Sequence, residues 1–289
     1  MVFEYPDDVH IPSYKPTVKG NARQIRQAVE MMKNAKRPIL YIGGGIIASH
    51  SEEELLGVAE ALQIPVVTTL MAKSAFPSSH PLNLGHVGMH GSKYANFAVT
   101  NADLLVAVGA RFSDRVTGKL ADFAPEAKVI HVDVDPAEIG KNRIPQIPIV
   151  GDAKVVLAGM KEQLDKDGYE PKTKEWLEQI EEWRSRHPFY SPGLVALNGS
   201  ISPEGSLDLL SDMLDPENSI VTTEVGQHQM WAAQHIDREV PRTFLTSGGL
   251  GTMGFGFPAA IGAKVACPDK EVVCVAGDGS FQMNSQEMA

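Results

Sequence analysis

The stretch VVCVAGDGSFQMNS, residues 272–285, carries the strongest indication of the fold. Its opening valines and Cys274 predict a buried strand, which ends at Gly277, Asp278 and Gly279. Two glycines let a backbone pass close to a bulky anion, and successive N–H groups can point at phosphate oxygens. A carboxylate between them is an oxygen ligand suited to Mg²⁺. The stretch therefore predicts half of a Mg²⁺–diphosphate site, and its structural alternative is an ordinary strand-to-helix turn.

Composition limits the classes of protein and of partner. A chain of 289 residues, 43% of them hydrophobic, can form about two domains with buried cores. No apolar run approaches the ~20 residues that cross a bilayer, and the acidic first residues lack the features of a signal peptide. The formal net charge of −10 disfavours nucleic acid and anionic membranes. We expect a cytoplasmic protein that binds neither, and a phosphate-bearing ligand would have to be held by local backbone and Arg geometry.

The two cysteines indicate the redox compartment. Cys267 and Cys274 both lie in apolar sequence. This usage predicts buried thiols in a reducing cytosol and no disulfide framework.

Helix and strand patterns alternate along the first part of the chain. Apolar residues at helical spacing predict a helix over residues 22–34. Ser51 and the glutamates after it have the pattern of a capping box that opens a second helix. Asp152 is expected to cap a third helix, over residues 153–164. Strands are predicted over residues 39–42, 65–69, 104–108, 129–132 and 147–150, the last as an edge strand because of Pro148.

A second strand–helix pattern follows a charged helix predicted over residues 174–186. Ser202 is expected to cap a helix that has Pro203 at its first position. Strands are predicted over residues 220–223 and 272–275, and a glycine-dense loop leads into a helix over residues 259–266. This alternation predicts an α/β fold with two doubly wound parallel-sheet domains, the second incomplete. We expect an extended lead-in at 1–19, a middle domain at 20–165, a connecting helix and linker at 166–192 and a partial domain at 193–289.

Five loops of the first sheet carry its conspicuous polar and glycine residues. In open parallel sheets, ligands bind beyond the carboxyl ends of the strands. Residues 43–45, 68–71, 109–115, 133–135 and 151–152 all follow predicted strands. We name this set the five-loop edge and expect it to form one crevice. Gly43, Gly44 and Gly45 lack the G-x-G-x-x-G spacing, so their structural alternative is a tight turn.

Several motifs together resemble the large, catalytic subunit of acetolactate synthase, a thiamine-diphosphate enzyme family. Gly277-Asp278-Gly279-Ser280 alone is typical of the wider thiamine-diphosphate superfamily. The narrower resemblance comes from GMHG at 88–91, RFSDRVTGK at 111–119, EIGKN at 138–142, GQHQMW at 226–231 and SGGLGTMGFG at 247–256. It covers essentially the whole chain. It implies a middle domain of the FAD-binding type and the first half of a thiamine-diphosphate-binding domain.

The resemblance implies a role for each matched position. Asp278 would bind Mg²⁺, and Met253 would support the bent conformation of thiamine diphosphate. The thiamine-diphosphate contacts would be Val225, Gly226, Gln227, His228, Gly251, Met253, Asp278, Gly279 and Ser280. The FAD contacts would be Gly43, Gly44, Gly45, Thr69, Leu70, Met71, Gly88, Met89, His90, Gly109, Arg111, Asp114, Asp133, Val134, Gly151 and Asp152. Arg115 would anchor the carboxylate of a second 2-ketoacid, and Ser113 departs from the family's frequent Asp.

The residues themselves leave alternatives open. Arg111 and Arg115 suit bidentate contacts to carboxylate or phosphate, but they could instead pair with Asp114 on a solvated loop. His228 could be a structural hydrogen-bonding residue, and Asp133 could be a helix N-cap.

The implied reaction decarboxylates pyruvate and transfers the two-carbon unit to a second pyruvate or to 2-ketobutyrate, in the biosynthesis of valine and isoleucine. FAD would have no net redox part. The resemblance implies a homodimer or homotetramer and allows a small regulatory subunit. The family's activating glutamate, and the asparagine that completes its metal site, fall outside these residues. We therefore expect a fragment that forms no acetolactate alone and that binds FAD weakly. The alternatives are another thiamine-diphosphate carboligase or decarboxylase, or a non-catalytic nucleotide-binding fragment.

Overall fold

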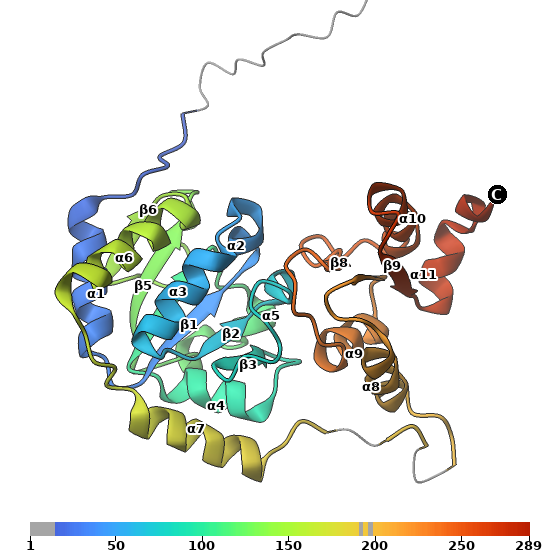
Figure 1. Ribbon diagram of the computed structural model, residues 1–289, viewed down its shortest axis with the longest axis horizontal. Helices are drawn as coiled ribbons and strands as arrows, with labels where there is room; N and C mark the ends of the chain where they lie inside the picture. Colours follow the sequence, from blue (N-terminus) through green and yellow to red (C-terminus); the bar gives the residue numbers. More distant parts are fainter. Residues whose placement is uncertain (1–14, 191–192, 196–198) are drawn as a thin grey trace, which may run out of the picture.

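The computed structural model describes residues 15–190, 193–195 and 199–289, and within them the chain forms two parallel sheets flanked by helices (Figure 1). Residues 1–14 of the predicted lead-in lie outside this description. The α/β class with two parallel sheets is confirmed. No helix within the described ranges has the length and apolar character needed to span a membrane.

The first sheet has six strands in the order β3-β2-β1-β4-β5-β6. They are β1 (Pro38–Ile42), β2 (Val66–Thr68), β3 (Asn83–His86), β4 (Leu104–Val108), β5 (Lys128–Asp133) and β6 (Ile147–Val150). All neighbours pair in parallel, so every strand ends at the same edge. The strand order reverses between β1 and β4, which makes the carboxyl ends of these two strands the switch point of the sheet. The predicted edge position of residues 147–150 is confirmed, since β6 is the last strand.

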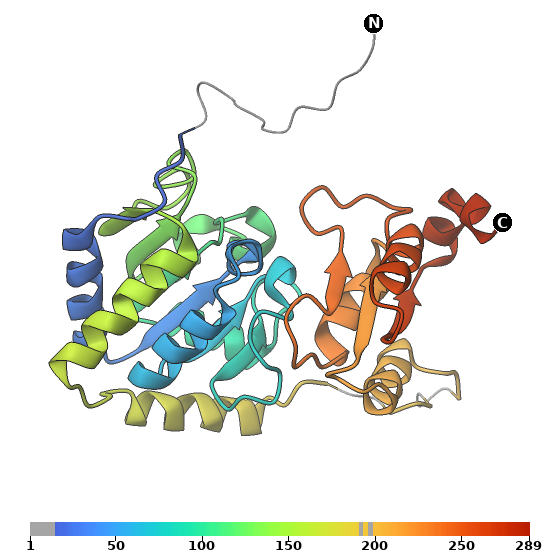
Figure 2. The ribbon, with the colours of Figure 1, turned by 45° about the horizontal axis from the view of Figure 1, so that its top comes forward.

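Helices cover both faces of this sheet (Figures 1 and 2). One buried cluster joins the sheet to α1 (Ala22–Asn34), α3 (Glu52–Leu62) and α6 (Ala153–Asp167), and it includes Ile46 of α2 (Gly44–Ser49). The cluster on the opposite face includes residues of α4 (Lys93–Asn101) and α7 (Lys174–Arg186). Trp176 and Ile180 of α7 are buried there, so this connecting helix is packed on the first sheet.

The second sheet has three parallel strands in the order β8-β7-β9. Its strands are β7 (Ser219–Thr223), β8 (Phe244–Thr246) and β9 (Glu271–Val275). Its helices are α8 (Pro203–Met213), α9 (Gln227–His235), α10 (Gly256–Ala266) and α11 (Asp278–Met283). The core of this part is small, and β9 is only half-buried along most of its length.

Two of the three predicted helix caps are confirmed. The Asp152 carboxylate accepts from the Val155 amide at 3.2 Å, and the Ser202 hydroxyl accepts from the Gly205 amide at 3.1 Å. The capping box at Ser51 is wrong: Ser51 begins α3, but its side chain makes no cap bond and donates to the Ile46 carbonyl at 3.4 Å. The short helix α2, which the sequence pattern did not indicate, supplies that competing carbonyl and buries Ser51 completely.

Some other expectations need correction. Cys267 and Cys274 are free thiols, as expected, but both are partly exposed rather than buried. Cys267 follows the last turn of α10, and Cys274 lies on the half-buried β9. Helix α6 continues to Asp167, three residues past its predicted end, before Gly168 turns the chain at φ +55°.

The two sheets are joined by direct contacts between residues 70–90 and residues 237–248. Backbone and side chain of Ser78 bond to Arg238, and the Glu239 carboxylate accepts from the amide and the hydroxyl of Ser79 at 2.9 and 2.7 Å. Arg242 adds a bond to Glu52 at 3.2 Å and one to the Ile47 carbonyl. These contacts fix how the second sheet lies beside the first.

Candidate functional site

The loops of the five-loop edge lie next to one another. Backbone bonds continue one residue past the strand ends: Thr69 donates to Ile42 at 2.9 Å, and Gly43 donates to Val108 at 3.1 Å. On the other side of the switch point, Gly109 donates to Val132 at 2.9 Å and Gly151 donates to Asp133 at 3.0 Å. Parallel pairing therefore brings all five loops to one edge, as the sequence predicted.

Two glycines of this edge serve close backbone packing. A Cβ added to Gly43 would lie 2.3 Å from the Gly109 carbonyl oxygen, and one added to Gly45 would lie 2.5 Å from the Gly109 Cα. Gly109 itself has φ +55°, and its carbonyl accepts from the Gly45 amide at 3.0 Å. The glycine run thus lets the β1 and β4 loops touch backbone to backbone, which is the tight-turn alternative. Gly43 is buried there, and Gly44 and Gly45 are half-buried.

Three side chains hold the loop that follows β4. Three consecutive carbonyls accept from them: Ala110 from the His131 ring at 3.1 Å, Arg111 from the Tyr41 hydroxyl at 2.8 Å and Phe112 from the Asn142 amide at 2.8 Å. Burial lowers the pKa of His131, which favours its neutral form, and burial raises the pKa of Tyr41. The loop is therefore anchored from the sheet and from the segment after β5.

The charged side chains of that loop are exposed. Arg111, Asp114 and Arg115 are all exposed, while Phe112 between them is buried against Tyr41, Phe123 and His131. Within the described part of the chain, neither arginine forms an ion pair with Asp114. The loop thus presents two unneutralised guanidinium groups beside the carboxyl ends of the strands, an arrangement suited to anionic ligands.

The segment Gly88–His90 meets the same loop. Gly88 has φ +104°, and a Cβ there would lie 2.7 Å from the Val116 Cα. Asn96 binds both backbone groups of Gly88 at 3.0 Å, and the Met89 amide donates to the Arg115 carbonyl at 3.3 Å. The structure therefore brings together Gly88, Met89 and Arg115, which are far apart in sequence. Met89 is exposed, with 65% of its surface accessible.

At the far end of the edge, two predicted carboxylates have local structural roles. Asp133 accepts from the Asp135 amide at 2.9 Å, and Asp152 caps α6. Each carboxylate keeps a second oxygen without a hydrogen bond among the described residues. They lie at the ends of neighbouring strands, since Asp133 pairs with Val150, two residues before Asp152.

The second group of predicted residues follows β7 and β9. These strands are neighbours, so Val225–His228 and Gly277–Ser280 leave the sheet side by side. His228 fills the space between them: a Cβ on Gly226 or on Gly277 would lie 3.0 or 2.9 Å from its ring. Its Nε2 atom is buried and has no partner, and burial lowers its pKa towards the neutral form. A buried ring nitrogen without a partner is a group that a ligand could satisfy.

A residue that the sequence reading did not single out, Glu224, holds this region together. Its fully buried carboxylate accepts from the Gly254 amide at 2.7 Å and from the Phe257 amide at 3.0 Å. Phe257 lies in the first turn of α10, whose unpaired N–H groups favour a negative charge. Glu224 thus fixes the loop that carries Gly251 and Met253. In the sequence, the feature that could have indicated Glu224 is its position directly after a predicted buried strand.

The closing stretch places Asp278 at the surface. Asp278 and Gly279 are exposed, and the Asp278 carboxylate accepts from the Gly279 amide at 2.8 Å. The Ser280 hydroxyl is buried and donates to the Val225 carbonyl at 3.3 Å, so only its backbone N–H stays available at the start of α11. Asn284 binds the Gly254 carbonyl, and a Cβ on Gly279 would touch the Met253 methyl group at 3.8 Å. No group of three or more metal-binding side chains occurs among the described residues.

Comparison with known proteins gives two family matches along the chain. The family described as "Thiamine pyrophosphate enzyme, central domain" matches residues 25–160. The family described as "Thiamine pyrophosphate enzyme, C-terminal TPP binding domain" matches residues 224–289. The first match covers the first sheet, and the second begins after β7 and includes Glu224, His228 and Asp278.

Individual relatives share about half of their aligned residues with this chain. It is 51% identical to a probable acetolactate synthase large subunit of Methanocaldococcus jannaschii, over 99% of this chain and 49% of the relative. It is 50% identical to an acetolactate synthase of Mycobacterium leprae, over 99% of this chain and 46% of the relative. It is 52% identical to an acetolactate synthase large subunit of Parasynechococcus marenigrum, over 91% of this chain and 42% of the relative. The chain spans about half the length of the curated relatives it matches.

Proposed function

The chain belongs to the thiamine pyrophosphate enzymes, and we propose that it acts as part of an acetolactate synthase large subunit. The observation that carries this proposal is the identity of about half of all residues along nearly the whole chain with proteins of that name. The proposed substrates are pyruvate and 2-ketobutyrate. The proposed domain division is residues 20–165 and 193–289, joined by 166–192, in a cytoplasmic homo-oligomer.

The proposed thiamine-diphosphate site lies at the carboxyl ends of β7 and β9. When bound, this cofactor supplies the electron sink for decarboxylation of a 2-ketoacid. The residues proposed to hold it are Val225, Gly226, Gln227, His228, Gly251, Met253, Asp278, Gly279 and Ser280. The buried, unpartnered Nε2 of His228 supports this fit, and so does the Ser280 N–H in the first turn of α11.

The proposed magnesium ligand is Asp278. Mg²⁺ takes few protein ligands and completes its shell with water and phosphate oxygens. One exposed carboxylate at the start of α11 fits that preference, because the diphosphate would supply further oxygens. Metal and diphosphate are therefore expected to bind together.

The proposed FAD site is the five-loop edge together with Gly88, Met89 and His90. Its support is the backbone contact of the β1 and β4 loops and the contact of Met89 with Arg115. The half-buried backbone at Gly44 and the exposed Arg111, which has no ion pair among the described residues, suit the phosphates of a dinucleotide. Arg115 is proposed to bind the carboxylate of the second 2-ketoacid, and the contact from Met89 would fix its backbone.

The decisive experiment titrates the purified chain with thiamine diphosphate, with and without Mg²⁺, by calorimetry. We expect binding that depends on Mg²⁺ and that weakens by about tenfold or more in Asp278→Asn, because the substitution removes the metal's charged ligand. The matched control is Asp269→Asn, in the turn before β9, which should bind like the parent. Equal affinity of Asp278→Asn and the parent would contradict the proposed metal site.

A second titration tests the first sheet. FAD is expected to co-elute with the chain, and Arg111→Ala should weaken its retention, while Arg186→Ala on α7 should leave it unchanged. Absence of flavin at high added FAD would count against the five-loop edge as an FAD site.

A further inference from the structure

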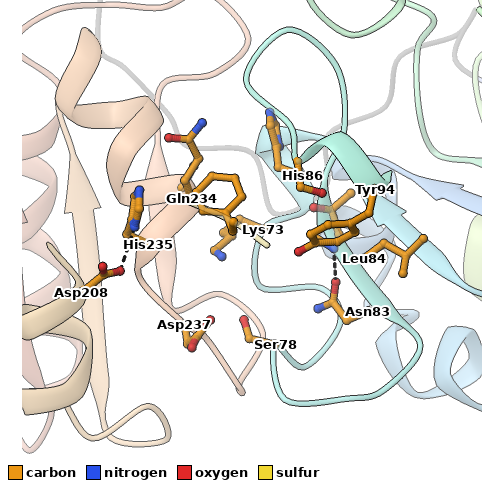
Figure 3. A pocket seen from close by; sticks show the side chains of 15 residues that line it. Lys73, Ser78, Asn83, Leu84, His86, Tyr94, Asp208, Gln234, His235 and Asp237 are labelled. Carbon is orange, nitrogen blue, oxygen red and sulfur yellow. Dashed lines mark hydrogen bonds and ion pairs between the residues drawn. The ribbon is translucent and has the colours of Figure 1, made fainter. Parts of the chain in front are cut away.

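A polar cavity lies between the two sheets, next to the proposed FAD site, with which it shares Thr68 of the five-loop edge. It has a volume of about 300 Å³. One wall comes from the first sheet, the loop after β2 and the start of α4, with Thr68, Lys73, His86 and Tyr94. Figure 3 shows the last three of these side chains. The opposite wall comes from α8, α9 and the segment after them, with Asp208, Gln234, His235 and Asp237. We name it the intersheet cavity. It is large enough for a small polar molecule.

The first wall carries polar atoms that have no partner in the protein. The Thr68 hydroxyl and the Nδ1 atom of His86 are buried and make no hydrogen bond. They lie next to each other, because Thr68 and His86 are paired positions on β2 and β3. A buried polar group without a partner destabilises a fold by about 1–3 kcal/mol. Two such groups side by side indicate a place where a ligand supplies the missing partner.

Lys73 adds an unpaired cation to the same wall. Its ammonium group forms no hydrogen bond or ion pair within the described residues. Burial lowers the pKa of Lys73 to about 8, against the opposing influence of the Asp237 charge, so the side chain remains mostly charged at pH 7. Burial and the nearby Lys73 charge lower the pKa of His86 to about 4, so this ring is neutral and can donate from one nitrogen.

Two polar side chains of the opposite wall already have partners within the protein. His235 binds Asp208 at 2.8 Å, and Gln234 donates to the His90 carbonyl at 2.6 Å. Asp237 is exposed and bears a negative charge that faces the cavity. The cavity therefore has one cation and two donors on one side and carboxylates on the other. An anionic group fits on the side of the cation and the two donors, and the carboxylates opposite disfavour the second negative charge of a phosphate dianion.

We propose that the intersheet cavity binds a small monocarboxylate, with its carboxylate group at Lys73, Thr68 and His86. Such a ligand satisfies all three unpartnered groups at once, and charge-assisted hydrogen bonds to a carboxylate are the stronger class. Because residues of both sheets line the cavity, its ligand also links them. This proposal stands on the cavity alone and does not depend on either cofactor.

The test uses propionate as the probe, with the chain free of thiamine diphosphate and FAD. Calorimetry at constant ionic strength should show saturable propionate binding in the millimolar range, and inorganic phosphate should bind at least about tenfold more weakly. In parallel, amine labelling of Lys73 by an activated ester, read by peptide mass spectrometry, should slow as propionate saturates. Lys93, exposed at the start of α4, should label at an unchanged rate.

Three variants should change the affinity for propionate, two of them by weakening it and one by strengthening it. Lys73→Met should weaken propionate binding by about tenfold or more, and Thr68→Val by a smaller factor, because a charged and a neutral partner are lost. Asp237→Asn should tighten binding, since it removes a like charge. Lys93→Met should bind like the parent.

Several outcomes would overturn the proposal: no saturable binding of propionate, equal binding by Lys73→Met, or phosphate binding as tight as that of propionate. If a variant fails to fold, the labelling of Lys73 in the parent chain still decides. Failure here leaves the cofactor titrations untouched, because their probes and readouts are separate.

Discussion

At the residue scale, Glu224 connects the core of the second sheet to the loop that bears Met253. Its carboxylate accepts two backbone N–H groups in a fully buried place. A buried acceptor of this kind stabilises mainly because its loss leaves donors unsatisfied. Glu224 therefore holds the loop in place, and it affects a ligand at Met253 only through that loop.

Glu224→Gln is expected to destabilise the chain by about 1–3 kcal/mol, because one of two charge-assisted bonds is lost or weakened. Chemical denaturation measures this change. Glu217→Gln, exposed just before β7, is the control and should stay within about 0.5 kcal/mol of the parent. A loss confined to thiamine-diphosphate affinity, with unchanged stability, would show that Glu224 acts on the ligand and not on the loop.

Lys73 predicts a pH-dependent effect on stability. Its pKa is about 8 in the folded chain and 10.5 when unperturbed, so the unfolded chain binds more protons between these values and stability rises with pH there. Lys73→Met should therefore be more stable than the parent at pH 7. The expected gain is about 1–2 kcal/mol, discounted because the lysine keeps partial contact with solvent through the cavity.

The gain should shrink as the pH approaches 10.5, where the unfolded lysine also loses its proton. Denaturation of parent and variant at pH 7 and pH 10 measures it, and other titrating groups cancel in the difference. A gain that is constant with pH would mean that packing, and not the buried charge, causes it.

At the element scale, two glycines in neighbouring helices have opposite expected effects. Gly45 of α2 abuts the Gly109 backbone, so Gly45→Ala should destabilise the chain by about 1–3 kcal/mol through overpacking. Gly57 of α3 faces only the flexible Lys161 side chain at 3.4 Å, so Gly57→Ala should stabilise it by about 0.5–1 kcal/mol. Thermal melts of both variants test the pair. Tolerance of Gly45→Ala would refute the close packing of the β1 and β4 loops.

At the scale of the whole molecule, Arg242 joins the two sheets. Its guanidinium binds Glu52 and the Ile47 carbonyl of the first sheet's helices, and its amide donates to Ser74 at 3.0 Å. The contact is polar and partly exposed, so it orders the two parts more than it stabilises either core.

Arg242→Ala should therefore speed hydrogen exchange in residues 237–248 and around Ser74 to Ser79, with strands β1 and β4 unchanged. Arg186→Ala, which removes an exposed ion pair within α7, is the control and should alter exchange only locally. Uniformly faster exchange across both sheets would mean that Arg242 stabilises the fold as a whole.

Much of the fold follows from the sequence alone. Residues 104–108 and 147–150 have the bounds of β4 and β6, and residues 22–34 and 174–186 have the bounds of α1 and α7. These segments are determined by local pattern, because continuous apolar runs and helical spacing specify buried strands and amphipathic helices. The convergence of the five loops also follows, since parallel strands end at one edge.

Other features depended on tertiary structure. β3 contains Asn83 and Gly85 and shows no strand pattern, so its pairing with β2 makes it a strand. α9 lacks a clear apolar face, and its buried alanines pack in the core of the second sheet. Ser51 makes no cap bond because its hydroxyl bonds instead to the Ile46 carbonyl and the Ser49 hydroxyl of α2. The roles of Glu224 and Tyr41 and the cavity at Lys73 arise from residues far apart in sequence. Local propensity determines which segments form elements, whereas burial and long-range hydrogen bonds decide which polar atoms meet and which remain free for a ligand.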